Sequence, residues 1–403
     1  MAPDTARPEH EGRPKGSALS VFLAFLRLGL TSFGGPIAHL GYFRAAFVTR
    51  WKWLGEEAFA DLVAVCQILP GPTSSQVGFA IGLQRAGPLG GLAAFAGFTA
   101  PSALLMIAAA LGASSLPADL RTRVFHGLVL VAVPIVAQAV IGMARTLCNT
   151  AATAALAIAA LIALLLVQQA FMQPLVIALG ALAGLLLPAR EPAASQAAPA
   201  PRGPAFVCLG LFAALLVGLP LLHAITPAPG VAVADAFYRS GALVFGGGHV
   251  VLPLLEAETV GRGWISADNF LSGYGAAQAL PGPLFAFAAY LGAASDTGLA
   301  PLAASLIALL AVFLPGLLLA AGVIPLWTSI RTHAWVSRLA AGASAAVVGV
   351  LAAALYRPVF VSAVLTPVDA LIAITGLAAL LLRAPVWLVV VSVTLLGAYS
   401  SAG

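Results

Sequence analysis

Two short motifs interrupt apolar stretches of the chain with residues that do not continue a helix. The first is CQILPGPTSSQ at residues 66–76, and the second is AQALPGPLFAF at residues 277–287. Proline lacks the backbone N–H that a helix uses, and glycine permits a sharp turn of the chain. We therefore expect six residues to break two helices: Pro70, Gly71, Pro72, Pro281, Gly282 and Pro283.

The residues after the first break are typical of the first turn of a helix, where hydroxyl side chains are favoured. The N-terminus of a helix inside a membrane presents free N–H groups and the positive end of the helix dipole, and both attract anions. The sequence therefore predicts an anion site that includes Thr73, Ser74, Ser75 and Gln76. After the second break the equivalents of the last three are Phe285, Ala286 and Phe287, so we expect the polar chemistry in the first half.

Two glutamines precede the breaks by the same spacing. Gln67 and Gln278 each lie three residues before a PGP triplet. Their amides either contact the anion or cap the broken backbone, and the sequence leaves both roles open.

Two glycine-rich segments are a second kind of interruption. They read LTSFGGPIAHL at residues 30–40 and LVFGGGHVVL at residues 243–252. Glycines let an anion approach the backbone closely, and interrupted segments at matching places in two halves indicate the binding site of a transporter. The candidate binding residues are Gly34, Gly35, His39, Gly246, Gly247 and His249, joined by Gly71 and Gly282 of the PGP breaks, and Pro36 is expected to break a helix. The histidines either donate to the anion or carry a proton, unless they serve only as satisfied polar contacts.

Arg27 and Arg239 are charged residues within apolar segments. An arginine at the centre of a membrane helix costs about 2.5–3.5 kcal/mol on insertion scales, so such residues tend to be functional. The planar fork of guanidinium donors suits a tetrahedral oxyanion. In the alternative interpretation, each arginine reaches the membrane surface or pairs with a structural acid such as Asp61.

Few acids occur near these segments. Glu57 and Asp61 are candidates for proton coupling. The alternative is that they are interfacial charges beside Arg50, Lys52 and Trp53.

The composition indicates a membrane protein. Of 403 residues, 61% are apolar and only 8% are charged, whereas soluble domains carry about 25% charged residues. The net charge of +5 is scattered, which argues against nucleic-acid binding. The three cysteines are not in paired spacing, so neither a disulfide framework nor a metal site is expected. We predict an all-α polytopic membrane protein with about 13 apolar segments, in contact with lipid and without a cofactor.

The two halves of the chain repeat each other. Phe25, Arg27, Gly29, Phe33, Gly34 and Gly35 recur 212 residues later as Phe237, Arg239, Gly241, Phe245, Gly246 and Gly247. Trp53, Gln67 and the first PGP triplet recur 211 residues later. Internal repeats of this kind are common in transporters, where many are inverted in the membrane. We prefer inverted repeats here, although the distribution of Lys and Arg fits parallel halves as well.

The composition along the chain suggests five parts. They are a tail at 1–16, a first repeat at 17–188, a Pro/Ala-rich linker at 189–204, a connecting helix at 205–225 and a second repeat at 231–403. A homodimer is compatible with this organisation.

Three segments resemble signature blocks of the chromate ion transporter family in its long, two-domain form. They read FLRLGLTSFGGPIAHLGYFR, LVAVCQILPGPTSSQVGFAIGLQRAG and FTAPSALLM. The resemblance implies a transporter in the inner membrane that is not an enzyme. It implies export of chromate, resistance to chromate and sulfate as a competing analogue. Within this resemblance, the positions expected to matter are Phe33–Pro36, Gln67–Pro72 and Ser74–Gln76.

Two other functions fit parts of the sequence. A carrier of sulfate, molybdate or another oxyanion would have the same architecture. A membrane lipid-pyrophosphate phosphatase could use Ser74 or Ser75 as a nucleophile beside His39, but no arginine follows Ser74 to hold the phosphate.

A substitution at Arg27 tests the predicted role of this side chain. Arg27→Ala is expected to abolish chromate export while the amount of protein in the membrane stays near normal. Arg27→Lys should also impair export strongly, because a point charge does not reproduce the fork of donors. Export by Arg27→Ala at the wild-type rate would remove Arg27 from the site.

Overall fold

The computed structural model describes residues 16–32, 35–113, 117–167, 172–188, 202–245, 250–327 and 334–400. Every regular element within these ranges is helical, which confirms the predicted all-α class. Gly34, Gly246, Gly247 and His249 lie outside the described residues, as do residues 1–15 of the tail and 189–201 of the linker.

The first half contains seven α-helices and one π-helical turn among its described residues. They are α1 (Ala18–Thr31), α2 (Gly35–Phe43), η1 (Arg44–Arg50), α3 (Glu56–Ile68), α4 (Thr73–Ala113), α5 (Ala118–Leu147), α6 (Ala151–Leu166) and α7 (Met172–Gly184). Helix α4 is two helices joined at a kink, because Ala86 and Gly87 have non-helical backbone angles. Helix α8 (Arg202–Ile225) then leads to the second half.

The second half repeats this order of elements. They are α9 (Pro229–Ala242), α10 (Val251–Thr259), α11 (Ala267–Ala279), η3 (Leu284–Ala286), α12 (Phe287–Ala294), α13 (Pro301–Val323), η4 (Ile324–Leu326), α15 (Ala334–Ala354), η5 (Leu355–Phe360), α16 (Val361–Ala363), α17 (Pro367–Leu381) and α18 (Val386–Ser400). Thr150 and Thr366 begin α6 and α17 with the same capping box, which marks these two helices as counterparts.

Five helical segments in the described part of the chain are long and apolar enough to cross a membrane. They are 73–112, 122–147, 203–225, 301–326 and 335–363, and six shorter apolar helices accompany them. The predicted count of about 13 apolar segments is therefore not confirmed and stays a prediction. Large apolar side chains are exposed along α1, α6, α8 and α17, as expected where a helix faces lipid.

Both predicted helix breaks are present. Helix α3 ends at Ile68 and α4 begins at Thr73, while α11 ends at Ala279 and the next helical turn begins at Leu284. Gly71 has a φ of +121° and Gly282 a φ of +100°, backbone conformations that favour glycine.

Each break is held by the other half of the chain. The N–H of Gly71 donates to the carbonyl of Val244 at 2.7 Å, and the N–H of Gly282 donates to the carbonyl of Ser32 at 2.9 Å. Val244 follows α9 and Ser32 follows α1, so the two bonds are equivalent in the repeat. A Cβ added at Gly71 would lie 2.8 Å from the Cα of Gly316, so glycine is required for this close approach.

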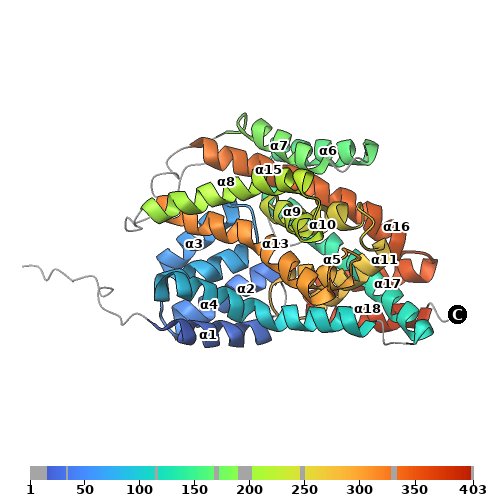
Figure 1. The fold of residues 1–403 in the computed structure, drawn as a ribbon. Helices are drawn as coiled ribbons and strands as arrows, with labels where there is room; N and C mark the ends of the chain where they lie inside the picture. Colours follow the sequence, from blue (N-terminus) through green and yellow to red (C-terminus); the bar gives the residue numbers. More distant parts are fainter. Residues whose placement is uncertain are drawn as a thin grey trace, which may run out of the picture.

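The later helices also exchange partners between the halves. Helix α5 packs against α17 and α18, and α15 packs against α6 and α7 (Figure 1). Small residues allow the backbones to approach: a Cβ added at Gly342 of α15 would lie 2.1 Å from the Gly180 carbonyl oxygen and 2.6 Å from the Gly184 Cα. Such contacts between small residues are typical of helix packing in membranes. The two halves therefore form one interlocked body.

Candidate functional site

The start of α4 is a buried helix N-terminus inside the protein. Thr73, Ser74, Ser75 and Gln76 are all buried. The N–H of Gln76 donates to the carbonyl of Pro72 at 2.9 Å, which is the first bond of the helix ladder. The three preceding N–H groups cannot have partners within the helix. They point toward the break and present the positive end of the helix dipole.

The side chain of Gln76 holds the break in shape. Its Nε2 donates to the carbonyl of Pro70 at 2.9 Å and to the carbonyl of Gly316 in α13 at 3.1 Å. Gln76 thus satisfies two backbone carbonyls that the interrupted helices leave free. Its Oε1 is buried and has no partner among the described residues.

His39 joins the site from α2. Its Nδ1 lies 3.3 Å from the Oγ of Ser74, and its ring packs edge-on against Phe98 at a centroid distance of 5.2 Å. The Oγ of Ser75 and the Oε1 of Gln76 are buried without a partner among the described residues, whereas the ring of His39 also interacts with the backbone of Ser32. Such groups are costly to leave unpaired, so their presence here indicates a ligand or water that pairs with them.

Three further hydroxyls lie near the second break, and sequence reasoning missed all of them. They are Ser32, Thr99 and Ser102, which are buried. A Cβ added at Gly282 would lie 2.8 Å from the Ser102 Oγ, and the Ser102 hydroxyl donates to the Thr99 carbonyl at 3.0 Å. The hydroxyls of Ser32 and Thr99 have no partner in the described structure. A signal was available, because the segment FTAPSALLM places Thr99 and Ser102 around a proline in an apolar run.

These residues form one polar cluster where the two broken helices meet. We call it the break cluster: Ser32, His39, Ser74, Ser75, Gln76, Thr99 and Ser102, with the N-terminus of α4. Hydroxyl and N–H donors predominate, and no side chain in the cluster carries a permanent positive charge. The arrangement suits an anion that is bound by dipoles and hydrogen bonds.

The structure does not bring Arg27 to the break cluster. Arg27 is exposed and shares its face of α1 with the exposed side chains of Leu23 and Leu30. Spacings of four and three residues place these side chains on one side of a helix. The substitution at Arg27 therefore tests whether transport requires this guanidinium in addition to the break cluster.

Arg239 is held by acids, as the alternative interpretation of its role proposed. It pairs with Asp235 at 2.8 Å and with Glu258 at 2.8 Å, and Arg262 pairs with Glu258 at 2.7 Å. The four residues join α9 to α10 and carry equal numbers of positive and negative charges. The guanidinium of Arg239 is therefore committed to Asp235 and Glu258 in this conformation.

The remaining predicted residues are dispersed. Gln67 is exposed on α3, and Gln278 shares a hydrogen bond with the Tyr274 side chain on α11. Asp61 lies partly buried on α3, and the side chain of Glu57 lies outside the described structure. Its neighbour Glu56 pairs with Arg44 at the surface, and this hydrogen bond raises the pKa of the Arg44 guanidinium. The role of these acids in proton coupling stays a prediction.

The glycine and proline residues that the structure describes have positions suited to turns. Gly35 has a φ of +79° and opens α2, with Pro36 in the first turn. Pro70, Pro72, Pro281 and Pro283 flank the two glycines of the breaks. Within the described ranges, no group of three or more His, Cys, Asp or Glu side chains is arranged to hold a metal ion.

Comparison with known proteins identifies a family. A family model described as "Chromate transporter" matches the chain twice, at residues 19–185 and 231–398. The chromate transport protein of Pseudomonas aeruginosa is 28% identical over 360 residues, which are 84% of this chain and 80% of that protein. A probable chromate transport protein of Synechococcus elongatus is 27% identical over 341 residues, or 82% of this chain and 81% of that protein.

Other relatives carry less specific names. An uncharacterized transporter of Methanocaldococcus jannaschii is 28% identical over 334 residues, which are 81% of this chain and 80% of that protein. No solved structure matches the chain.

The unpaired hydroxyl of Ser75 gives a test that separates binding from folding. Ser75→Ala removes no hydrogen bond from the described structure, so we expect the melting temperature to stay the same or rise. A bond from this hydroxyl to a bound oxyanion is worth about 1.5–3 kcal/mol, so sulfate affinity should fall about tenfold or more. Isothermal titration calorimetry with sulfate measures the affinity of the purified protein.

Ser305→Ala is the matched control. The Ser305 hydroxyl on α13 is also buried, but it donates to the Ala289 carbonyl at 2.9 Å. This variant should lose stability and keep its sulfate affinity. Equal affinity of Ser75→Ala and the wild type would exclude the Ser75 hydroxyl from the site.

Proposed function

The chain belongs to the chromate transporter family, and from this premise we propose that it exports chromate across the inner membrane, with sulfate as a competing analogue. Members of the family are membrane transporters and not enzymes, so the phosphatase alternative is set aside.

The observation that carries the proposal is the buried start of α4. A helix N-terminus with free N–H groups, two hydroxyls and a histidine is surrounded by protein, where each unpaired polar group is costly. A tetrahedral dianion offers acceptor oxygens in several directions and would pair with these donors together. Broken helices that meet at the interface between two repeats are the usual place for such a site in transporters.

Export is the direction that the membrane potential favours. A dianion that leaves an inside-negative cell gains about 4.6 kcal/mol per 100 mV, twice the value for a single charge. Uptake of the same ion would need a coupled cation. Chromate and sulfate share their charge and tetrahedral shape, so a site of hydrogen-bond donors should discriminate between them only weakly. A carrier of sulfate or molybdate therefore remains the second candidate.

Inverted repeats are part of the proposal. Two contacts between α5 and α17 show the relative direction of these helices. The Nε2 of His126 lies 3.1 Å from the Oδ1 of Asp369, and further along both helices Gln138 donates to the carbonyl of Leu380 at 3.2 Å. The two helices therefore run parallel. Helix α17 follows α15 and α16 after a turn of residues 364–366. If α15 and α17 cross the membrane in opposite directions, α5 and its counterpart α15 also run in opposite directions.

The relation of α15 to α7 agrees with this arrangement. Gly184 approaches Arg338 and Gly342, whereas Gly180 approaches Gly342 and Ala346, so these two helices run antiparallel. The reciprocal bonds from Gly71 and Gly282 also fit a two-fold relation between the halves. A two-fold axis in the plane of the membrane produces inverted repeats.

Transport in everted vesicles tests the direction and the driving force. Uptake of labelled chromate should increase when the vesicle interior is made positive, because this potential drives the dianion in the direction of export. Excess sulfate should reduce the uptake. Vesicles without the protein are the control.

Two other outcomes would contradict the proposal. Uptake that does not respond to potential would exclude electrogenic export. Uptake of molybdate or sulfate without any uptake of chromate would show that the substrate is one of these ions and not chromate.

Paired cysteines test the inverted repeats. Asn149 in the α5–α6 turn and Leu365 in the α16–α17 turn are exposed and occupy matching places. In a chain whose three native cysteines are replaced, we expect Asn149→Cys and Leu365→Cys to react with a membrane-impermeant maleimide from opposite sides. Intact cells should label one variant and everted vesicles the other. Labelling of both from the same side would indicate parallel halves.

A further inference from the structure

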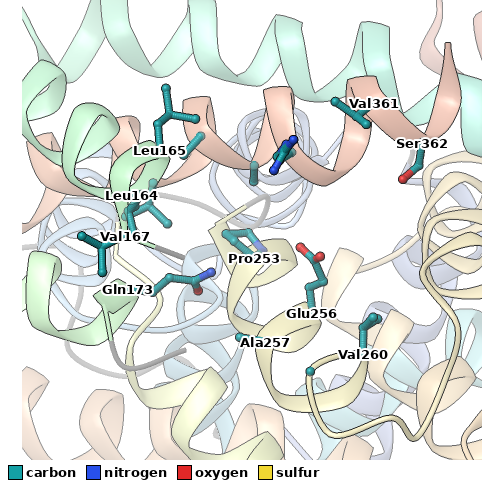
Figure 2. A pocket seen from close by; sticks show the side chains of 15 residues that line it. Leu164, Leu165, Val167, Gln173, Pro253, Glu256, Ala257, Val260, Val361 and Ser362 are labelled. Atoms are coloured by element: carbon teal, nitrogen blue, oxygen red, sulfur yellow. The ribbon is translucent and has the colours of Figure 1, made fainter. Parts of the chain in front are cut away.

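A cavity of about 630 Å³ lies between the two halves, away from the break cluster. Its walls come from α6 and α7 of the first half and from α10, α15, η5 and α16 of the second (Figure 2). No residue of the break cluster lines it. The cavity therefore needs an explanation of its own.

Four polar side chains line this otherwise apolar space: Gln173, Glu256, Arg357 and Ser362. Figure 2 shows the carboxylate of Glu256 and the amide of Gln173 projecting into the cavity. The Oε1 of Gln173 is buried and has no partner among the described residues. Arg357 is exposed, which leaves its guanidinium accessible at the edge of the cavity.

Neither Glu256 nor Arg357 takes part in an ion pair with another residue that the structure describes. No ion pair joins these two side chains, although the structure describes both. Glu258, two residues along α10, takes the nearby cations Arg239 and Arg262. A carboxylate and a guanidinium therefore line one cavity without neutralising each other.

Other ionisable groups near Glu256 do not reach this space. The elements packed against α10 are α9, α11 and α15, and α5 packs against η5. Their ionisable residues are Asp235, Tyr238 and Arg239 on α9, Asp268 and Tyr274 on α11, Arg338 on α15, and Asp119, Arg121, Arg123, His126 and Arg145 on α5. Of the charged residues on these elements, only Arg357 lines the cavity with Glu256.

The backbone at Arg357 supports a ligand-binding role. Arg357 has φ −129° and ψ +122° within η5, so the apolar segment 335–363 is interrupted there. Proline follows at position 358 and cannot donate to the helix ladder. Broken backbone at membrane depth is tolerated where it lines a polar cavity, and π-helical turns are frequent at functional sites.

We propose that this cavity is a second oxyanion site in which anion binding is coupled to protonation of Glu256. Arg357 supplies the positive charge for a tetrahedral oxyanion, and the amide Nε2 of Gln173 and the hydroxyl of Ser362 supply hydrogen-bond donors, whereas the Oε1 of Gln173 can only accept. This inference rests on the proposed function, since it assigns the ligand class from oxyanion transport. Its failure leaves the break cluster unaffected.

The coupling follows from the two charges in one cavity. An ionised carboxylate repels a dianion at short range, whereas the protonated acid does not and can donate a hydrogen bond. The bound anion therefore favours the protonated form of Glu256, and protonation favours the anion to the same extent. The affinity of this site should increase as the pH falls, by up to about tenfold per pH unit.

Proton uptake measures this coupling directly. Sulfate is added to the purified protein in weakly buffered solution with a pH indicator, between about pH 5.5 and 8. The wild type should take up protons when sulfate binds. Glu256→Gln should bind sulfate without proton uptake, because the amide is neutral at every pH. Arg357→Gln should lose the uptake because the anion no longer binds beside Glu256.

Two controls keep the assignment specific. Asp268→Asn removes an exposed carboxylate outside the cavity and should leave the proton uptake unchanged. Ser75→Ala weakens the break cluster and should also leave it unchanged. Melting temperatures of all variants establish that each is folded.

The outcomes separate this inference from the proposed function. Sulfate binding with no proton uptake, or uptake that persists in Glu256→Gln, overturns the coupled site and leaves the transporter. A wild type that binds no oxyanion overturns both. The same titration in nanodiscs with and without phosphatidylglycerol distinguishes a free anion from a lipid phosphate. Loss of the uptake only where phosphatidylglycerol is present would assign the cavity to a lipid headgroup.

Discussion

The structure depends on two backbone hydrogen bonds that cross between its halves. A helix broken inside a bilayer leaves N–H and C=O groups that no water can satisfy, and each one costs several kcal/mol. The N–H of Gly71 is satisfied by the carbonyl of Val244, and the N–H of Gly282 is satisfied by the carbonyl of Ser32. Each break therefore needs a hydrogen-bond acceptor from the other half of the chain, so the two halves fold as one unit. The exchange of partners by α5 and α15 extends the same dependence to the later helices.

On this shared backbone the two halves have different side chains. The start of α4 carries hydroxyls, whereas its counterpart carries Phe285, which packs against Phe313 at a centroid distance of 5.5 Å. The acids that pair with Arg239 have no counterpart in the first half, where Leu23 and the neighbouring pair Ala46 and Phe47 occupy the equivalent positions. The first half therefore keeps polar groups without partners, and the second half neutralises or fills the same space. A duplicated fold can specialise in this way because the same backbone hydrogen bond holds each break, whichever side chains follow the PGP triplet.

The sequence predicted what depends on local chemistry. A glycine between two prolines specifies a break, whereas single prolines such as Pro134 and Pro315 lie within helices. The ends of α3 and α11 and the start of α4 could therefore be read from the two PGP triplets. The exposure of Arg27 could not be predicted from the sequence, because it depends on which face of α1 the rest of the protein covers. The pairing of Arg239 with Glu258 joins residues from two helices, and a repeat that lacks these acids in one copy gives no hint of it. Ser32, Thr99 and Ser102 meet only because Gly282 of the other half packs beside them.

A site built from dipoles and hydroxyls has consequences for a carrier. A fixed cation in a dry interior would hold a dianion very strongly, because Coulomb attraction grows as the dielectric constant falls. Transport needs binding that is strong enough to remove water from the ion and weak enough to release it. Helix N–H groups and serine hydroxyls meet this need, since they stabilise the anion without a full opposite charge. In the proposed arrangement, the guanidinium of Arg357 lines the second cavity, and the nearby carboxyl of Glu256 limits its attraction for the anion. The membrane potential can then supply the direction of transport, because release from the break cluster does not have to overcome a buried ion pair.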